Sequence, residues 1–257
     1  MMKKSMMNTN QKFGKIRKIG KIIKISVCVS VRGRCAEMPL PFFIIKQRNQ
    51  LNKEIMKVEF KHDHALAKDD TRWYLLEQME DLHKYKPKLL TLPANNFLFE
   101  HLVSSRYYGA SIDCVEYDKA VYEKAKTHKF NKYNYEYLDI FDKAHANPGK
   151  YDLIWIDLCG NLSLSNMNNL ISVIQNTLKS HSILAFTFTA GREFGLNKIM
   201  DVYGCKEPKE FRFEFFPNLL VRLGKLSHPK FRLDNLIKYK NNKGHSTPMC
   251  MFVFKTY

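Results

Sequence analysis

Short apolar runs alternate with longer segments of helical spacing from Met56 to the C-terminus, and this alternation constrains the fold more than any other feature. The short runs, read as strands, are residues 88–92, 111–118, 133–142, 151–158 and 182–190. Three helix-length segments between them are residues 97–106, 119–130 and 167–181, and a further helix over 71–83 precedes the first strand. Parallel neighbouring strands need a crossover of this length, so the order predicts a doubly wound, mostly parallel sheet.

The last part of the chain departs from this alternation. Residues 235–241 and 247–257 read as two strands joined directly by a turn that contains Gly244. Two strands joined by so short a connection pair antiparallel. The prediction is therefore an α/β fold with a seven-stranded, mostly parallel sheet that ends in an antiparallel C-terminal hairpin.

Positive charge is concentrated at the two ends of the chain. Residues 1–55 carry a net charge of +11, residues 56–201 carry −1, and residues 202–257 carry +7. We expect residues 1–55 to form a basic, flexible N-terminal extension and residues 56–257 to form the α/β domain. Basic ends around a near-neutral middle favour a polyanionic partner such as nucleic acid, with chemistry in the middle; a solvated basic tail is the alternative.

The composition argues against several other classes of protein. No run of about 18 apolar residues is present, so no stable membrane insertion is expected. The six cysteines include no C-x-x-C pair, which disfavours a zinc site or a disulfide framework and favours a reducing, intracellular location. The basic N-terminus leaves organelle targeting open, and the sequence does not define an oligomeric state.

Polar residues stand where the predicted strands end, at the edge where ligands of open parallel sheets bind. The first strand is followed by Pro93-Ala94-Asn95-Asn96, and the second ends in Glu116, which comes 23 positions after Pro93. A carboxylate at that spacing suits the two hydroxyls of a ribose. Asp139 at the end of the third strand could accept from an adenine amine, with Ile140 or Phe141 against the ring. A strand-end acid that only meets solvent is the alternative for each.

With these residues in place, the chain from about residue 72 onward resembles a class I S-adenosylmethionine-dependent methyltransferase. The segments "LLTLPANN", "VEYD", "YLDIF" and "IDLCGN" stand at the positions of the first four motifs of that family. The resemblance implies S-adenosylmethionine as cofactor and a methionine-side or substrate-side role for Asp157. The cofactor-binding set that it implies is Thr91, Pro93, Ala94, Asn95, Asn96, Glu116, Tyr117, Asp139, Ile140 and Asp157.

The first motif departs from the family pattern. Thr91 stands where the family usually has an acid, and Pro93, Asn95 and Phe97 stand where it usually has glycines. Asparagine is one of the few other residues that tolerate the left-handed backbone region, so Asn95 and Asn96 could still shape a cofactor turn. The turn is therefore either a cradle built differently or the remnant of one.

The fourth motif provides the candidate catalytic residues. "DLCGN" lacks the prolines and the aromatic ring typical of amino-methylating DNA enzymes. Asp157 and Asn161 could orient an amine or hydroxyl, since methyl transfer needs mainly alignment and desolvation. Substrate contacts are expected from Cys159, Gly160, Arg192 and Glu193, although Cys159 could be a core filler and Arg192 could simply pair with Glu193.

The predicted function is methyl transfer from S-adenosylmethionine to nucleic acid, RNA or DNA. The alternative is a catalytically inactive, methyltransferase-like protein that binds nucleic acid or serves as an accessory subunit. Aromatic and basic residues interleave over 206–240, which suits single-stranded nucleic acid or, alternatively, a layer that covers the sheet, with "FRFEFF" alternating as a strand would. No metal is expected, because His62, His64 and their acidic neighbours read better as a solvated face.

Overall fold

The computed structural model describes residues 29–31, 34–36, 57–60, 64–93, 97–127, 133–190, 196–239 and 248–257. The chain divides into two compact units, Met1–Leu51 and Asn52–Tyr257. In the first unit, β1 (Val29–Val31) and β2 (Arg34–Ala36) pair antiparallel. Most of the predicted basic extension, residues 1–55, lies outside the described residues.

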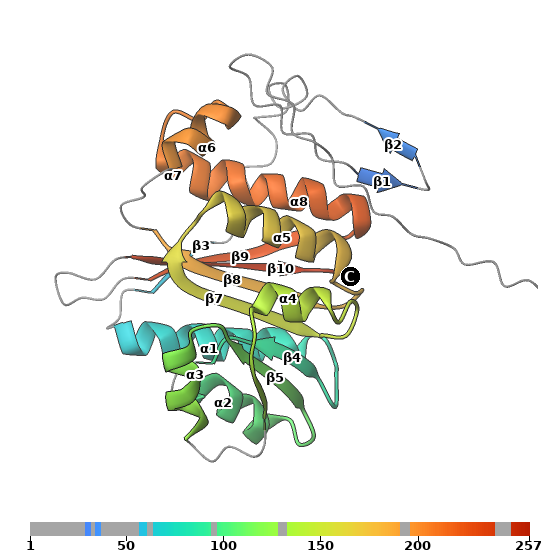
Figure 1. The fold of residues 1–257 in the computed structure, drawn as a ribbon, viewed down its shortest axis with the longest axis vertical. Coiled ribbons are helices and arrows are strands. Elements are labelled where there is room, and N and C mark those ends of the chain that lie inside the picture. The colour runs from blue at the N-terminus through green and yellow to red at the C-terminus, as the bar shows by residue number, and fades with distance from the viewer. Residues whose placement is uncertain are drawn as a thin grey trace, which may run out of the picture. The chain divides into compact units, whose positions relative to one another are not determined.

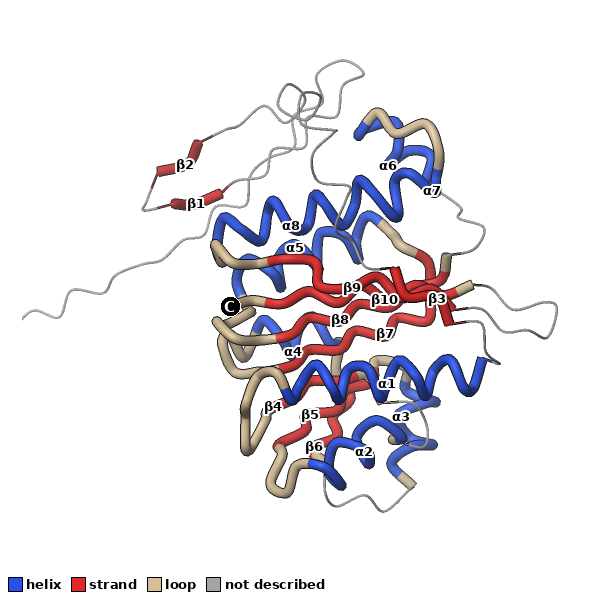
Figure 2. The backbone as a smooth tube through the Cα atoms, turned by 180° about the vertical axis from the view of Figure 1, so that it is seen from behind, coloured by secondary structure: helices blue, strands red, loops and turns tan. Residues whose placement is uncertain are grey.

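The second unit contains one sheet in the order β3-β9-β10-β8-β7-β4-β5-β6, which can be followed in Figure 2. Its strands are β3 (Lys57–Phe60), β4 (Lys88–Thr91), β5 (Ser111–Glu116), β6 (Asn134–Tyr137), β7 (Leu153–Asn161), β8 (Ile183–Thr189), β9 (Arg232–Tyr239) and β10 (Met249–Lys255). Only β10 runs antiparallel to its neighbours, β8 and β9, among the described strands of this sheet.

All seven predicted strands are present, and the parallel sheet with an antiparallel C-terminal hairpin is confirmed. The predicted turn around Gly244 lies outside the described residues. An eighth strand, β3, was not predicted; it pairs in parallel with β9 at the edge of the sheet. Four residues are too few for a periodic signal, so only pairing with a strand far along the chain defines β3.

Helices cover both faces of the sheet (Figure 1). They are α1 (His64–Glu80), α2 (Leu98–Arg106), α3 (Lys119–Lys126), α4 (Ile140–His145), α5 (Leu164–Asn176), α6 (Leu196–Tyr203), α7 (Pro208–Glu210) and α8 (Phe216–Ser227), with a π-helical turn, η1 (Phe211–Phe215), before α8. One core cluster packs under α4, α5, η1 and α8, and the other packs under α1, α2 and α3. No helix in the described part of the chain is long and apolar enough to cross a membrane.

Two local predictions were wrong. The strand predicted over 133–142 ends at Tyr137, and Ile140 begins α4. Asp139 is the N-cap residue of that helix, and its Oδ1 accepts a hydrogen bond of 2.7 Å from the Phe141 amide. The apolar residues that continue the strand pattern instead fill successive positions of a helix whose buried face includes Ala144.

The buried face of α2 also differs from the prediction. Helical spacing suggested that Phe97, Leu98, His101 and Leu102 share one apolar face, but Leu98 and His101 are exposed. The buried residues of α2 are Phe99, Glu100 and Val103. Phe97 precedes the helix with φ of 50°, so the helix starts from a left-handed residue and its face is rotated relative to the expected one.

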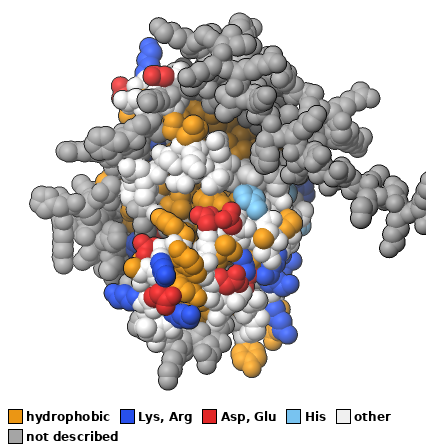
Figure 3. Space-filling model, in the orientation of Figure 1, with side chains coloured by type: hydrophobic (Ala, Val, Ile, Leu, Met, Phe, Trp, Pro, Cys, Tyr) orange, Lys and Arg blue, Asp and Glu red, His pale blue; other side chains and the backbone are white. Residues whose placement is uncertain are grey.

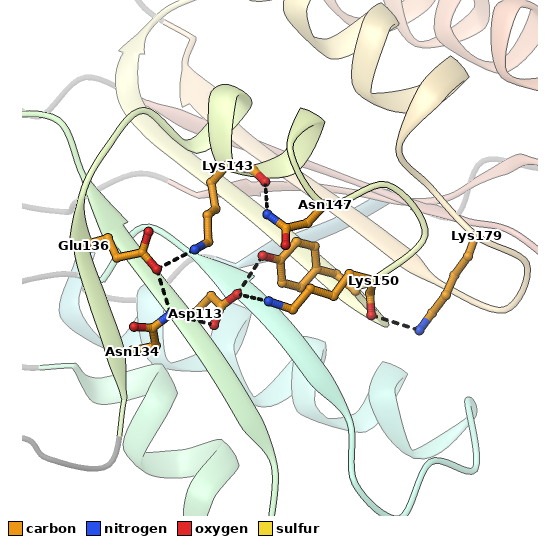
Figure 4. Close-up of polar contacts among 8 residues, drawn as sticks. Asp113, Asn134, Glu136, Lys143, Asn147, Lys150 and Lys179 are labelled. Atoms are coloured by element: carbon orange, nitrogen blue, oxygen red, sulfur yellow. Dashed lines mark hydrogen bonds and ion pairs between the residues drawn. The ribbon is translucent and has the colours of Figure 1, made fainter. Parts of the chain in front are cut away.

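A buried carboxylate ties β5 to its neighbours (Figure 4). Asp113 accepts hydrogen bonds from Lys150 Nζ at 2.6 Å, Tyr151 Oη at 2.7 Å and Asn134 Nδ2 at 3.2 Å. Burial raises the pKa of Asp113, but these three hydrogen bonds and the Lys150 charge together lower it below its ordinary value. The carboxylate therefore links β5 to its neighbour β6 and to the segment that leads into β7.

Candidate functional site

The carboxyl ends of β4, β5, β6 and β7 meet at one edge of the sheet, because these strands run parallel. Thr91 on β4 is level with Cys114 on β5 and with Trp155 on β7. Glu116 and Asp157 lie two residues further along β5 and β7, beyond the end of β4. Successive side chains of a strand alternate between faces, so Glu116 and Asp157 share the face covered by α1, α2 and α3.

Glu116 shapes the turn that leads into α3. Its Oε1 accepts from the Asp118 amide at 2.8 Å, and the Asp118 carboxylate in turn caps α3 by accepting from Ala120 and Val121. Glu116 is half-buried, and its second carboxylate oxygen accepts no hydrogen bond from the described residues. Tyr117 beside it is 66% exposed. One carboxylate oxygen of Glu116 thus remains available to a ligand at this edge.

Asp139 lies beyond the next strand, and it is partly committed as well. One oxygen caps α4 through the Phe141 amide, and the other has no hydrogen bond among the described residues. Ile140 and Phe141 are 2% and 4% exposed and pack in the cluster under α4 and α5. Because Ile140 and Phe141 are buried, only the half-buried Asp139 carboxylate of these three residues is accessible at the edge of the sheet.

Asp157 lies inside β7 and not at its end, which corrects the predicted strand boundary. Asp157 pairs with Thr187 and Asn161 pairs with Thr189, so four positions on β7 correspond to two on β8 and the strand bulges between them. The Asp157 side chain is 16% exposed, and its Oδ2 lies 3.9 Å from Lys68 Nζ on α1. A bulge re-aims side chains locally, and here it falls on the candidate catalytic segment.

The other residues of this segment are placed less directly. Asn161 is exposed, and its Oδ1 accepts a hydrogen bond from Thr189 Oγ1. The side-chain oxygen of Asn161, one of the two groups that could orient an amine or hydroxyl, is therefore already engaged. Gly160 and the backbone of Cys159 lie in the bulged part of β7, whereas Arg192 and Glu193 lie outside the described residues, as do Ala94, Asn95 and Asn96.

Thr91 does not reach the surface of the edge. It is 0% exposed, and its Oγ1 donates to Glu100 Oε1 at 2.6 Å. Glu100 on α2 is 2% exposed, and burial raises the pKa of its carboxyl against the opposing hydrogen bond from Thr91. Pro93 is also buried. A carboxyl group therefore does lie next to the first motif, but it comes from the helix nine positions later.

Lys68 and Glu100 are the two residues at this site that sequence reasoning missed. Glu100 had one signal, an acid between the buried residues Phe99 and Val103, although the expected helix face placed it outward. Lys68 had none, because it lies 89 positions before Asp157 and meets it only through the packing of α1 along the sheet. Neither contact could be found from local spacing.

No group of three His, Cys, Asp or Glu side chains in the described part of the chain is arranged to hold a metal ion. Of the acids near His64, Asp69 pairs with Arg72 one turn along α1. His62 and Asp63 lie outside the described residues.

The aromatic residues of 206–240 point mostly into the core. Phe211, Phe216 and Phe231 are 0% exposed, and "FRFEFF" forms a π-helical turn and the start of α8, not a strand. Lys238 lies 4.0 Å from the centre of the half-buried Phe213 ring. Of the two interpretations, the covering layer with inward aromatic rings describes these residues.

Comparison with known structures identifies the fold. A SAM-dependent methyltransferase from Leishmania major superposes with a TM-score of 0.51 at 16% identity, covering 75% of this chain and 72% of that one. The chain thus has the class I methyltransferase fold, as the strand-end motifs suggested. The sequence matches no protein-family model and no curated protein.

Two further structures are similar at lower scores. Geranyl diphosphate C-methyltransferase from Streptomyces coelicolor, solved with S-adenosyl-L-homocysteine, has a TM-score of 0.47 at 8% identity, covering 74% of this chain and 81% of that one. The fibrillarin pre-rRNA processing protein of Methanococcus jannaschii has a TM-score of 0.45 at 15% identity, covering 67% of each chain.

Proposed function

We propose that this protein is an S-adenosylmethionine-dependent methyltransferase that acts on nucleic acid. The observation that carries the proposal is the gathering of Glu116, Asp139 and Asp157 at the carboxyl edge of adjacent parallel strands in a class I methyltransferase fold. Ligands of open α/β sheets bind at this edge, close to the point where the strand order reverses. Here β4 has β5 on one side and β7 on the other, which is such a reversal.

The residues present fit the cofactor in part. Glu116 and Asp139 each keep one carboxylate oxygen clear of the hydrogen bonds to the neighbouring backbone, and these oxygens would accept from ribose hydroxyls and the adenine amine. Thr91, Pro93 and Ile140 are buried, so we propose that they pack beneath the cofactor-binding residues and do not contact the cofactor. When bound, S-adenosylmethionine supplies the electrophilic methyl group.

Asp157 is proposed to orient the acceptor. Its side chain lies on the same face as Glu116, and its Oδ2 is 3.9 Å from Lys68 Nζ. Thr189 donates a hydrogen bond to the side-chain oxygen of Asn161. The amide nitrogen of Asn161 is therefore the group proposed to donate a hydrogen bond to the substrate. Nucleic acid is proposed as the substrate because the chain carries +17 and concentrates this charge at its ends.

Calorimetry of the full chain with S-adenosylmethionine tests the cofactor site. Glu116→Gln keeps an oxygen for the Asp118 amide but removes the charge, so the turn is preserved while the ribose contact weakens. A hydrogen bond to a charged group contributes about 1.5–3 kcal/mol, so affinity should fall by roughly 10- to 150-fold. Glu123→Ala, on the exposed side of α3, is the control and should bind like the wild type.

Methyl transfer itself is tested with tritiated S-adenosylmethionine and unmodified RNA, single-stranded DNA and protein as acceptors. Incorporation into nucleic acid that is lost in Asp157→Asn supports the proposal. Incorporation into protein alone would show that the substrate is protein and not nucleic acid. An absence of binding at millimolar S-adenosylmethionine would refute the proposed methyltransferase activity.

A second candidate is an inactive, methyltransferase-like protein that binds nucleic acid. Three existing hydrogen bonds favour this alternative. One carboxylate oxygen of Glu116 and one of Asp139 each accept from a backbone amide, and the Thr91 hydroxyl donates to Glu100. Under this alternative, Glu116→Ala and Asp139→Ala would leave cellular function intact, while charge reversal in the basic ends would abolish it. The calorimetric titration distinguishes the two candidates.

A further inference from the structure

An open hollow lies at the opposite edge of the sheet, beside the amino ends of β4 and β5. It encloses about 390 Å³ and is lined by Glu80, His83, Lys84, Tyr85, Arg106 and Tyr107. The lining comes from two loops, one joining α1 to β4 and the other joining α2 to β5. The Ser111 amide donates to the Pro87 carbonyl at 3.0 Å and ties these loops together. Both lie on the right-hand side of Figure 1.

Lysine side chains around the hollow lack acidic partners. Lys84 and Lys86 are exposed, and neither forms an ion pair with the residues that the structure describes. Arg106 is held by Glu80, with its Nη2 2.7 Å from Oε1. Asp81, the next residue after Glu80, lies 3.0 Å from Lys255 Nζ. The local excess of positive charge thus falls on the two lysines, within a segment of the chain that is close to neutral overall.

Exposed aromatic rings stand beside these charges. Tyr85 is 79% exposed and Tyr108 is 90% exposed, and neither ring packs on another ring among the described residues. On this side Figure 3 shows blue Lys and Arg side chains beside protruding orange side chains. Large rings held in water have unfavourable exposed surface that a planar partner would cover.

Tyr107 also lines the hollow. Its hydroxyl oxygen is buried and has no hydrogen-bond partner among the described residues, although a buried hydroxyl without a partner costs about 1–3 kcal/mol. Burial and the nearby Glu80 carboxylate raise the pKa of Tyr107, so the hydroxyl keeps its proton near neutral pH.

We propose that the loops 81–87 and 107–110 form a binding surface for single-stranded nucleic acid, with bases stacked on Tyr85 and Tyr108 and phosphates beside Lys84 and Lys86. Alternating rings and cations match the repeat of base and phosphate in a single strand. A duplex keeps its base faces inside, so it would leave both tyrosines exposed. The surface lies at the other edge from Glu116 and Asp157, so it would hold a strand outside the methyl-transfer site.

Fluorescence anisotropy of a labelled 12-nucleotide single-stranded RNA with the full chain tests this surface. Lys84→Ala with Lys86→Ala should reduce the slope of log Kd against log salt by roughly 1.4, since each phosphate contact on a single strand contributes about 0.7. The matched control removes two exposed lysines of α3, Lys119→Ala with Lys124→Ala, and should change the slope less.

The tyrosines are tested separately from the charges. Stacking contributes about 1–3 kcal/mol per base, so removing both rings in Tyr85→Ala with Tyr108→Ala should weaken RNA binding at least roughly 30-fold. For this tyrosine variant, the slope of log Kd against log salt should equal that of the wild type, because no cation is removed. A duplex of the same sequence should bind the wild-type and tyrosine variants equally.

Three results would overturn the proposal: a salt slope for the lysine variant equal to that of the control, unchanged RNA binding by the tyrosine variant, or equal loss of duplex and single-strand binding. Titration of the same variants with S-adenosylmethionine separates this surface from the proposed function. Failure of the wild type to bind cofactor would refute the proposed methyltransferase activity and leave RNA binding at this surface measurable.

Discussion

Replacing Asp113 by alanine removes the carboxylate that joins β5 to β6 and to the segment before β7. In the folded protein this side chain is 6% exposed and accepts from Lys150, Tyr151 and Asn134 (Figure 4). A hydrogen bond to a charged group contributes about 1.5–3 kcal/mol, and the loss of one partner of a buried pair costs about 3–5 kcal/mol. The side chain of Lys150 is 31% exposed and can return to water, which lowers the cost of losing its partner.

The expected loss is therefore about 3 kcal/mol of unfolding free energy, with most of it from Tyr151, which is 2% exposed and would keep a buried hydroxyl. For a domain of this size, 3 kcal/mol corresponds to a fall of about 6–12 °C in Tm. Urea denaturation followed by circular dichroism at pH 7 measures the loss. Glu123→Ala, an exposed acid on α3, is the control and should change stability by less than about 0.5 kcal/mol.

The pH dependence of this loss follows from the lowered pKa of Asp113. A carboxyl with a lowered folded-state pKa stabilises the protein above its unfolded value of about 3.9 and loses that contribution as pH falls through the folded-state value. The difference between wild type and Asp113→Ala should be full at pH 7 and shrink below about pH 4. A loss at pH 7 no larger than that of the control would refute the role of the network.

Three further changes test other parts of the fold. Gly224→Ala should destabilise by about 2 kcal/mol in urea titrations despite the better helix propensity of alanine, because the added Cβ would meet Phe231 Cδ1 at 2.2 Å; equal stability would contradict this packing. Glu100→Gln should stabilise more at pH 8 than at pH 4, since burial raises the pKa of Glu100 and ionisation there opposes folding; a pH-independent effect would argue against it. His83→Gly should raise the unfolding free energy by about 0.5–1 kcal/mol, because His83, in the turn after α1, has a left-handed φ of 51°; a lower Tm would be the contrary result.

Local pattern alone located most of the elements. The sequence predicted β7 and β8 as continuous apolar runs, because a strand buried on both faces needs apolar residues throughout. It also predicted seven of the strands in their order along the chain. The grouping of Glu116 and Asp157 at one edge also followed, since parallel strands bring their carboxyl ends together. The end of β6 was misread because the Asp139 cap and the apolar residues after it fit a strand equally well.

The amino-acid sequence by itself determined the α/β class, the order of strands and helices and the edge at which the carboxylates gather, because these depend on periodicities of a few residues. Only the tertiary structure decided how those carboxylates are engaged: Lys68 with Asp157, Glu100 with Thr91, and the bulge of β7 against β8. It also decided that the loops around Tyr85 and Tyr108 form one hollow. Such contacts join positions far apart in the chain, and their energies depend on burial and register that no local pattern encodes.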